Sequence, residues 1–222
     1  MTSKTVLRRV LLGLVSLLLA SGGLLAATVP AQADEAPKVL LLLDVSGSMN
    51  AELNGGGTKF AAAKKALKQV AASLPAGTQV GLRVYGSEVE EDQDENPAAC
   101  KDTKLVLPIG PLDQQKMNAA VDSFKAQGET PIAYSMGQAV DDLGVSGKRV
   151  LILVSDGQET CAKDPCPIVK KLAGSGVDLQ FNAIGLAVDS KARSQLQCIA
   201  KAGGGAYYDA NDTDSLSQAL GR

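Results

Sequence analysis

The chain alternates short apolar runs with stretches in which apolar residues recur every three or four positions. Continuous apolar runs at 39–43 and 150–154 are typical of strands that are buried on both faces. Strands are predicted at 39–43, 79–85, 104–109, 149–154, 177–184 and 206–209. Helical spacing and the flanking turn residues predict helices at 58–74, 112–126, 132–143, 167–173, 191–202 and 213–220.

This alternation predicts βαβ units, and therefore an α/β fold with a mostly parallel sheet covered by helices on both faces. Pro108 lies within the third predicted strand. Because proline cannot donate a hydrogen bond to a neighbouring strand, we expect this strand at a sheet edge. Aromatic residues make up only 3% of the chain and hydrophobic residues 45%, so the core must consist mainly of aliphatic side chains.

Residues 1–33 have the pattern of a secretory signal peptide. A positively charged start is followed by an apolar run over 10–29 and by the small residues of Ala31-Gln32-Ala33, which are typical of a cleavage site. We expect export, cleavage and a mature chain that begins near Asp34. An uncleaved membrane anchor is the alternative, because the apolar run approaches the ~20 residues that a membrane span needs.

Composition narrows the chemistry that the chain can perform. The sequence contains no histidine, which excludes Ser-His-Asp catalysis and zinc sites with histidine ligands. Three of the 22 basic residues and none of the 24 acidic residues precede position 34, so the mature part carries a formal charge of −5. This acidity and the scarcity of aromatic residues argue against nucleic acid and against an acidic membrane surface as partners.

Four cysteines follow the signal segment: Cys100, Cys161, Cys166 and Cys198. An even number of cysteines in an exported chain predicts two disulfides. A metal cluster is one alternative, although the chain has neither histidine nor a Cys-x-x-Cys pair, and buried free thiols are another.

Oxygen-bearing side chains follow two buried strands of the predicted sheet. Asp44, Ser46 and Ser48 come directly after the first strand, and Asp156 follows the fourth. Thr130 precedes the helix at 132–143. Ligands of α/β sheets bind beyond the carboxyl ends of the strands, and these hard oxygen donors suit Mg²⁺. Each residue alone is more typical of a turn or a helix cap, but their joint occurrence favours a metal site.

The pattern Asp44-x-Ser46-x-Ser48, then Thr130, then Asp156 resembles the metal-ion-dependent adhesion site of von Willebrand factor type A domains, in particular those of exported bacterial proteins. The resemblance spans residues 36–220. It implies a doubly wound, six-stranded sheet in which one edge strand, at 104–109, is antiparallel. It also implies that the three hydroxyls contact the metal, and that the two aspartates do so directly or through water.

The resemblance further implies a secreted module that binds a protein ligand by coordinating its acidic side chain through a divalent cation, Mg²⁺ or alternatively Mn²⁺ or Ca²⁺. We expect a monomer without enzymatic activity. A regulatory or scaffold subunit with a structural metal is one alternative. A metal-dependent hydrolase is another, with Glu129, Glu159 or an aspartate as the base. The two glutamates are otherwise expected to be solvated loop residues.

Within this topology the preferred disulfide pairing is Cys100–Cys161 with Cys166–Cys198. A Cys161–Cys166 bridge would require Cys100 to reach Cys198 from one sheet edge towards the other. The preferred pairing also places a disulfide beside the loop that carries Asp156.

Overall fold

A computed structural model describes residues 36–53, 56–75, 77–90, 96–162, 164–174, 178–211 and 215. The chain divides into two units, 1–33 and 34–222, and the description concerns the second. The predicted signal peptide lies outside the described residues, as does the predicted helix at 213–220 apart from Ser215. No helix within the described ranges is long and apolar enough to cross a membrane.

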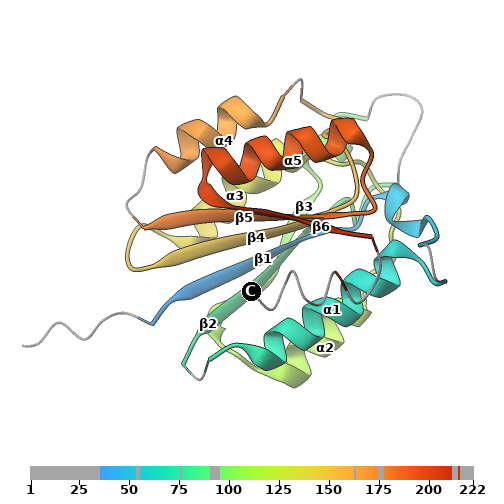
Figure 1. Cartoon of the computed structure of the whole chain (residues 1–222). Helices are drawn as coiled ribbons and strands as arrows, with labels where there is room; N and C mark the ends of the chain where they lie inside the picture. The colour runs from blue at the N-terminus through green and yellow to red at the C-terminus, as the bar shows by residue number, and fades with distance from the viewer. Residues whose placement is uncertain are drawn as a thin grey trace, which may run out of the picture. The chain divides into compact units, whose positions relative to one another are not determined.

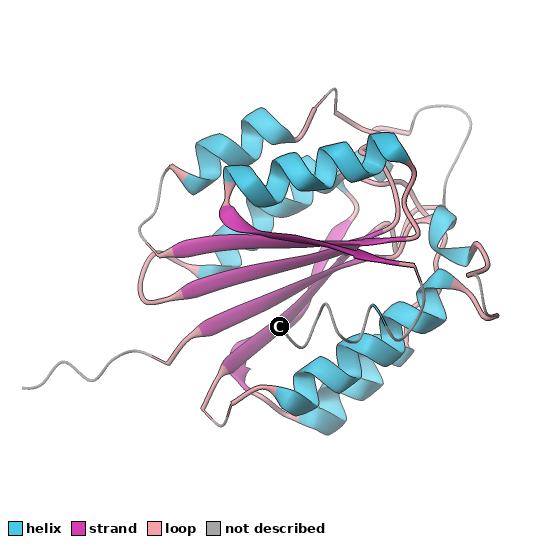
Figure 2. Cartoon of the chain, in the orientation of Figure 1, coloured by secondary structure: helices cyan, strands magenta, loops and turns pink. Residues whose placement is uncertain are grey.

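Six strands form one sheet, in the order β3-β2-β1-β4-β5-β6 (Figures 1 and 2). Their bounds are β1 Lys38–Asp44, β2 Gln79–Tyr85, β3 Thr103–Pro111, β4 Arg149–Ser155, β5 Leu179–Leu186 and β6 Gly204–Ala210. β3 pairs with β2 in the antiparallel direction, and all other pairs are parallel. The prediction of a mostly parallel sheet with an antiparallel edge strand is therefore confirmed. The β2–β3 register shifts near Pro108, as expected for a residue that cannot donate to the ladder.

Helices cover both faces of the sheet, as predicted (Figure 1). α1 (Lys59–Ser73) and α2 (Gln114–Asp122) lie on one face, and α3 (Ile132–Leu143), α4 (Cys166–Ala173) and α5 (Ser190–Ala202) lie on the other. The short 3-10 helices η1 (Gly47–Asn50) and η2 (Ala99–Lys101) follow β1 and precede β3. The helix predicted at 112–126 is shorter at both ends. It begins after Asp113, whose carboxylate caps α2 by accepting hydrogen bonds from the N–H groups of Gln115 and Lys116.

The sheet separates two hydrophobic cores, and β1 contributes to both. Leu41 and Leu43 pack in the core under α1 and α2. Leu40 and Leu42 pack in the core under α3, α4 and α5. All four side chains are fully buried, which explains the continuous apolar run of this strand.

The strand order reverses between β1 and β4, which are direct neighbours. In doubly wound folds this switch point separates the loops that leave the adjacent carboxyl ends and opens a crevice between them. The loops after β1 and β4 carry the predicted aspartates and serines, so the fold places these residues at its natural ligand site.

Candidate metal centre

Asp44 ends β1 as a fully buried carboxylate. It accepts a hydrogen bond of 2.8 Å from the Ser46 N–H and one of 2.6 Å from the hydroxyl of Ser155 on β4. Burial, and then the negative charge of Asp156, raise the pKa of Asp44 to about 6. The β1 loop is thereby anchored to the neighbouring strand by a carboxylate whose ionisation is unfavourable without a nearby cation.

Two serine hydroxyls connect this loop to Asp156. The Oγ atoms of Ser46 and Ser48 lie 3.1 Å apart, and the Ser48 hydroxyl donates to Asp156 Oδ1 at 2.7 Å. A Cβ atom added at Gly157 would lie 3.5 Å from Ser48 Oγ and 3.7 Å from Thr130 Oγ1. The hydroxyls of Ser48 and Thr130 therefore border the same space, which the glycine leaves open.

The structure brings all five predicted residues to one end of the sheet. Ser46, Ser48 and Thr130 line a hollow of about 590 Å³. Asp44 and Asp156 are buried next to it and reach these residues through the hydrogen bonds described above.

Two glycines allow the loop before Thr130 to approach the β1 loop. The Gly128 C=O accepts a hydrogen bond from the Gly47 N–H at 2.9 Å, and its N–H donates to the C=O of Gly86 at 3.0 Å. Gly86 has a positive φ of 67°, and a Cβ there would lie 2.4 Å from the Glu129 carbonyl oxygen. Gly86 was not singled out from the sequence, although a glycine directly after a strand, here β2, is a signal that could have indicated this close backbone contact.

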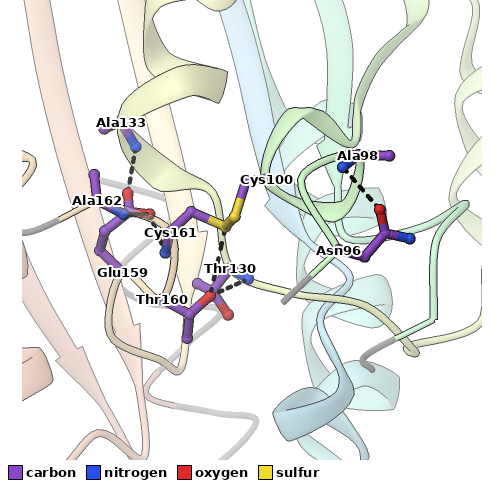
Figure 3. Close-up of a disulfide and its surroundings, with 9 residues drawn as sticks. All are labelled: Asn96, Ala98, Cys100, Thr130, Ala133, Glu159, Thr160, Cys161 and Ala162. Carbon is purple, nitrogen blue, oxygen red and sulfur yellow. Dashed lines mark hydrogen bonds between the residues drawn. A yellow bond between two sulfur atoms is a disulfide. The ribbon is translucent and has the colours of Figure 1, made fainter. Parts of the chain in front are cut away.

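Glu159 ties the loop after β4 to the start of α3. Its carboxylate accepts hydrogen bonds from the N–H groups of Ala133 at 2.6 Å, Cys161 at 2.9 Å and Ala162 at 3.0 Å (Figure 3). The expectation of a solvated loop residue was wrong, because Glu159 is half-buried and caps a helix from another segment. Burial raises the pKa of Glu159, while its backbone donors oppose that shift.

Thr160 continues this connection to Thr130. Its Oγ1 accepts a hydrogen bond of 2.9 Å from the Thr130 N–H, and its own N–H donates to the Thr130 C=O at 3.3 Å (Figure 3). The position of Thr130 relative to Asp156 is thus set by the segment that directly follows Asp156.

Both disulfides have the preferred pairing. Cys100–Cys161 joins η2 to the loop after β4, and Cys166–Cys198 joins α4 to α5. The first disulfide, drawn in Figure 3, borders a second hollow that shares Glu129 and Thr160 with the hollow of the candidate site.

Lys59 is a site residue that the sequence reasoning missed. Its Nζ lies 2.7 Å from Asp156 Oδ2, and the two side chains are 13% and 1% exposed. The available signal was a cation in the first turn of α1, where the helix dipole disfavours positive charge.

The donor set fits a hard divalent cation. Among the described residues no group of three or more His, Cys, Asp or Glu side chains is placed to hold a metal. The centre instead combines three hydroxyls with two carboxylates, which are all oxygen donors of the kind that Mg²⁺ prefers. Two carboxylates balance the charge of one divalent ion.

A sequence model of the family described as von Willebrand factor type A domain matches residues 38–222. The chain belongs to this family. The uncharacterized protein YwmD of Bacillus subtilis (strain 168) is 34% identical over 212 residues, which cover 91% of this chain and 94% of YwmD.

Solved structures share the fold of this von Willebrand factor type A chain. The von Willebrand factor type A protein from Catenulispora acidiphila has a TM-score of 0.66 and 20% identity, covering 84% of this chain and 41% of that one. The pilus adhesin SpaC from Lactobacillus rhamnosus GG has a TM-score of 0.68 and 18% identity, covering 85% and 30%. The chain therefore spans less than half the length of either solved chain.

Proposed function

We propose that the protein is an exported binding module that captures an acidic side chain of a partner protein through a divalent cation, most favourably Mg²⁺. The ligands would be Asp44, Ser46, Ser48, Thr130 and Asp156. The observation that carries the proposal is the convergence of the Ser48 and Thr130 hydroxyls on the space left open by Gly157, with Asp156 hydrogen-bonded to Ser48. The signal-like segment and the two disulfides support an extracellular location.

The hydrogen bonds orient the donors for this role. Ser48 gives its proton to Asp156 and accepts from the Ser46 hydroxyl, so one lone pair of Ser48 Oγ remains to face a cation. Asp44 is fixed by Ser46 and Ser155, which holds its charge beneath the hydroxyls. A bound divalent ion would supply an electrophilic centre for an incoming carboxylate, because protein ligands of this kind leave part of its coordination shell to outside oxygens.

A binding role is favoured over hydrolysis by the state of Glu159. This carboxylate was a candidate general base, but it accepts three backbone hydrogen bonds at the start of α3 and beside it. A base must reach the proton that it abstracts, and one held in this way has little freedom to do so. The likeness in fold to a protein named as a pilus adhesin supports an adhesion role. We also propose that the module acts as a monomer.

Calorimetric titration with Mn²⁺ and Mg²⁺ tests the metal site directly. The wild-type chain should bind one ion, and Ser48→Ala and Asp156→Asn should abolish or strongly weaken binding. Asp141→Asn removes an exposed carboxylate on α3 and should leave binding unchanged. Saturation by metal of the Asp156→Asn variant at wild-type affinity would contradict the proposed ligands.

Capture from the native cell surface tests the binding role. The immobilised chain should retain a partner in the presence of Mg²⁺ and release it when a chelator is added. Asp44→Ala should retain none. Partner capture that persists after chelation would exclude the metal-dependent mechanism.

A further inference from the structure

A lysine ammonium lies within the candidate metal centre. The two oxygens of Asp156 have different partners: Oδ1 accepts from the Ser48 hydroxyl, and Oδ2 accepts from Lys59 Nζ at 2.7 Å. Lys59 is largely enclosed, with its side chain 13% exposed. The centre therefore contains one fixed positive charge beside its two carboxylates.

Backbone hydrogen bonds and a helix cap hold Lys59 next to the candidate metal centre. The Lys59 N–H donates to the Ala51 carbonyl at 2.9 Å, and Leu53 donates to the Gly57 carbonyl, so the chain after η1 folds back before α1 begins. The Thr58 side chain caps α1 by accepting from the Ala61 N–H. These contacts fix the first turn of α1 beside the metal-site loops.

Stability alone does not explain this ion pair. Removing two charges from water costs about as much as their attraction returns, so a buried pair is a weak stabilising device. A lysine in the first helical turn also opposes the helix dipole. By contrast, Lys68 on the same helix pairs with Asp122 where both side chains are more exposed, an ordinary surface pair.

We propose that Lys59 makes the metal-loaded centre electropositive and thereby selects an anionic ligand, a carboxylate, over a neutral oxygen donor. The idea rests on the proposed function. Asp44 and Asp156 together balance a divalent ion, so the ammonium of Lys59 leaves the loaded centre with a net charge of +1. The same ammonium repels the metal when no anion is bound. Metal and carboxylate therefore bind cooperatively, each raising the affinity for the other.

Titration with Mn²⁺, in the absence and presence of acetate, tests this coupling. Acetate should raise the Mn²⁺ affinity of the wild-type chain. Lys59→Met should bind Mn²⁺ alone roughly tenfold more tightly, since a like charge a few ångströms from the ion is removed, and should lose most of the acetate effect. Lys59→Arg keeps the charge and should behave like wild type. Lys65→Met removes an exposed lysine of the same helix and is the matched control.

The outcomes separate the two proposals. If the wild-type chain binds no metal, both the proposed function and this coupling fail. If the wild-type chain binds metal but Lys59→Met binds it equally or more weakly, with the acetate effect intact, Lys59 only positions Asp156 and the coupling alone is overturned. Circular dichroism verifies the fold of each variant. A merely structural role for Lys59 cannot produce tighter metal binding together with a smaller acetate effect.

Discussion

The hydroxyl of Ser155 donates a hydrogen bond of 2.6 Å to the carboxylate of Asp44, although the two residues lie 111 positions apart in the sequence. The bond crosses from β4 to β1, the two strands at which the sheet order reverses. Both residues are fully buried. The carboxylate is therefore held rigidly below the hydroxyls, in surroundings that penalise its charge.

This relationship predicts that Asp44 makes the metal-free protein less stable at neutral pH than at about pH 4. Burial and Asp156 raise the pKa of Asp44 from 3.8 to about 6 in the folded state. When folding raises the pKa of a carboxyl group, the folded protein loses stability as the pH increases from the unfolded pKa to the folded pKa of that group. The free energy of unfolding of the metal-free chain should thus fall between about pH 4 and pH 6, by on the order of 1–3 kcal/mol.

Asp44→Asn should remove that loss. Its amide retains a hydrogen-bond acceptor for Ser46 and can donate to Ser155, so the contacts persist without the charge. Urea unfolding with a chelator present should find the variant more stable than wild type at pH 7 and nearly equal at pH 4, while metal binding is lost. A variant that is less stable at both pH values would show that the ionised carboxylate stabilises the fold.

The Glu159 cap predicts a second, milder effect. Glu159→Gln retains the shape but replaces one acceptor oxygen with a donor, which faces backbone N–H groups. We expect a loss of about 1–2 kcal/mol in unfolding free energy. Metal affinity should also fall, because Thr160, the residue after Glu159, accepts the hydrogen bond from Thr130 N–H that holds this proposed ligand. Asp141→Asn, which alters an exposed carboxylate on α3 away from this segment, should change neither quantity.

The parts of the fold that could be predicted depend on local patterns. The run Leu40–Leu43 is apolar because both faces of β1 are buried, and the Asp44, Ser46 and Ser48 pattern is contained within five consecutive residues. These features can be read without knowing the tertiary structure. The edge position of the third strand was predicted from Pro108, whereas the doubly wound arrangement and the antiparallel direction of that strand were implied by the family resemblance.

The residues that were missed act through contacts distant in sequence. Lys59 meets Asp156 across 97 positions, and Ser155 meets Asp44 across 111. The position of Lys59 in the first turn of α1 marks it as unusual, but the sequence around it does not show which carboxylate is its partner. Glu159 was misjudged for a related reason. Two of its donors, Cys161 and Ala162, are local, but the contact that buries it at the start of α3 is with Ala133, 26 positions earlier in the chain.

The disulfides provide a comparison within one molecule. Removing Cys100–Cys161, which spans 61 residues, should lower the unfolding free energy by about 4 kcal/mol on the chain-entropy estimate, and removing Cys166–Cys198, which spans 32, by a similar or slightly smaller amount. Their effects on metal binding should differ, because only Cys161 adjoins the Thr160 contact to Thr130.

Paired cysteine-to-serine variants measure this difference. The Cys100→Ser/Cys161→Ser chain should bind Mn²⁺ several-fold more weakly, as expected when outer contacts that orient a ligand are loosened. The Cys166→Ser/Cys198→Ser chain should retain wild-type affinity at a temperature where both variants remain folded. Equal losses of affinity would indicate that the metal centre responds only to overall stability.

Two glycine substitutions should separate the site from the fold. Gly157→Ala adds a methyl group at ordinary contact distances, 3.5 Å from Ser48 Oγ and 3.7 Å from Thr130 Oγ1, so the unfolding free energy should change by less than about 1 kcal/mol. The methyl group nevertheless enters the space that the two hydroxyls border, and metal affinity should fall at least about tenfold, as for other disturbances of ligand geometry.

Gly86→Ala is the opposite case. Its positive φ and a Cβ 2.4 Å from the Glu129 carbonyl oxygen require the backbone to shift, at a cost of about 1–3 kcal/mol or more. Thermal unfolding and Mn²⁺ titration of both variants make the comparison. Normal metal affinity in Gly157→Ala would place the ion elsewhere than between Ser48 and Thr130.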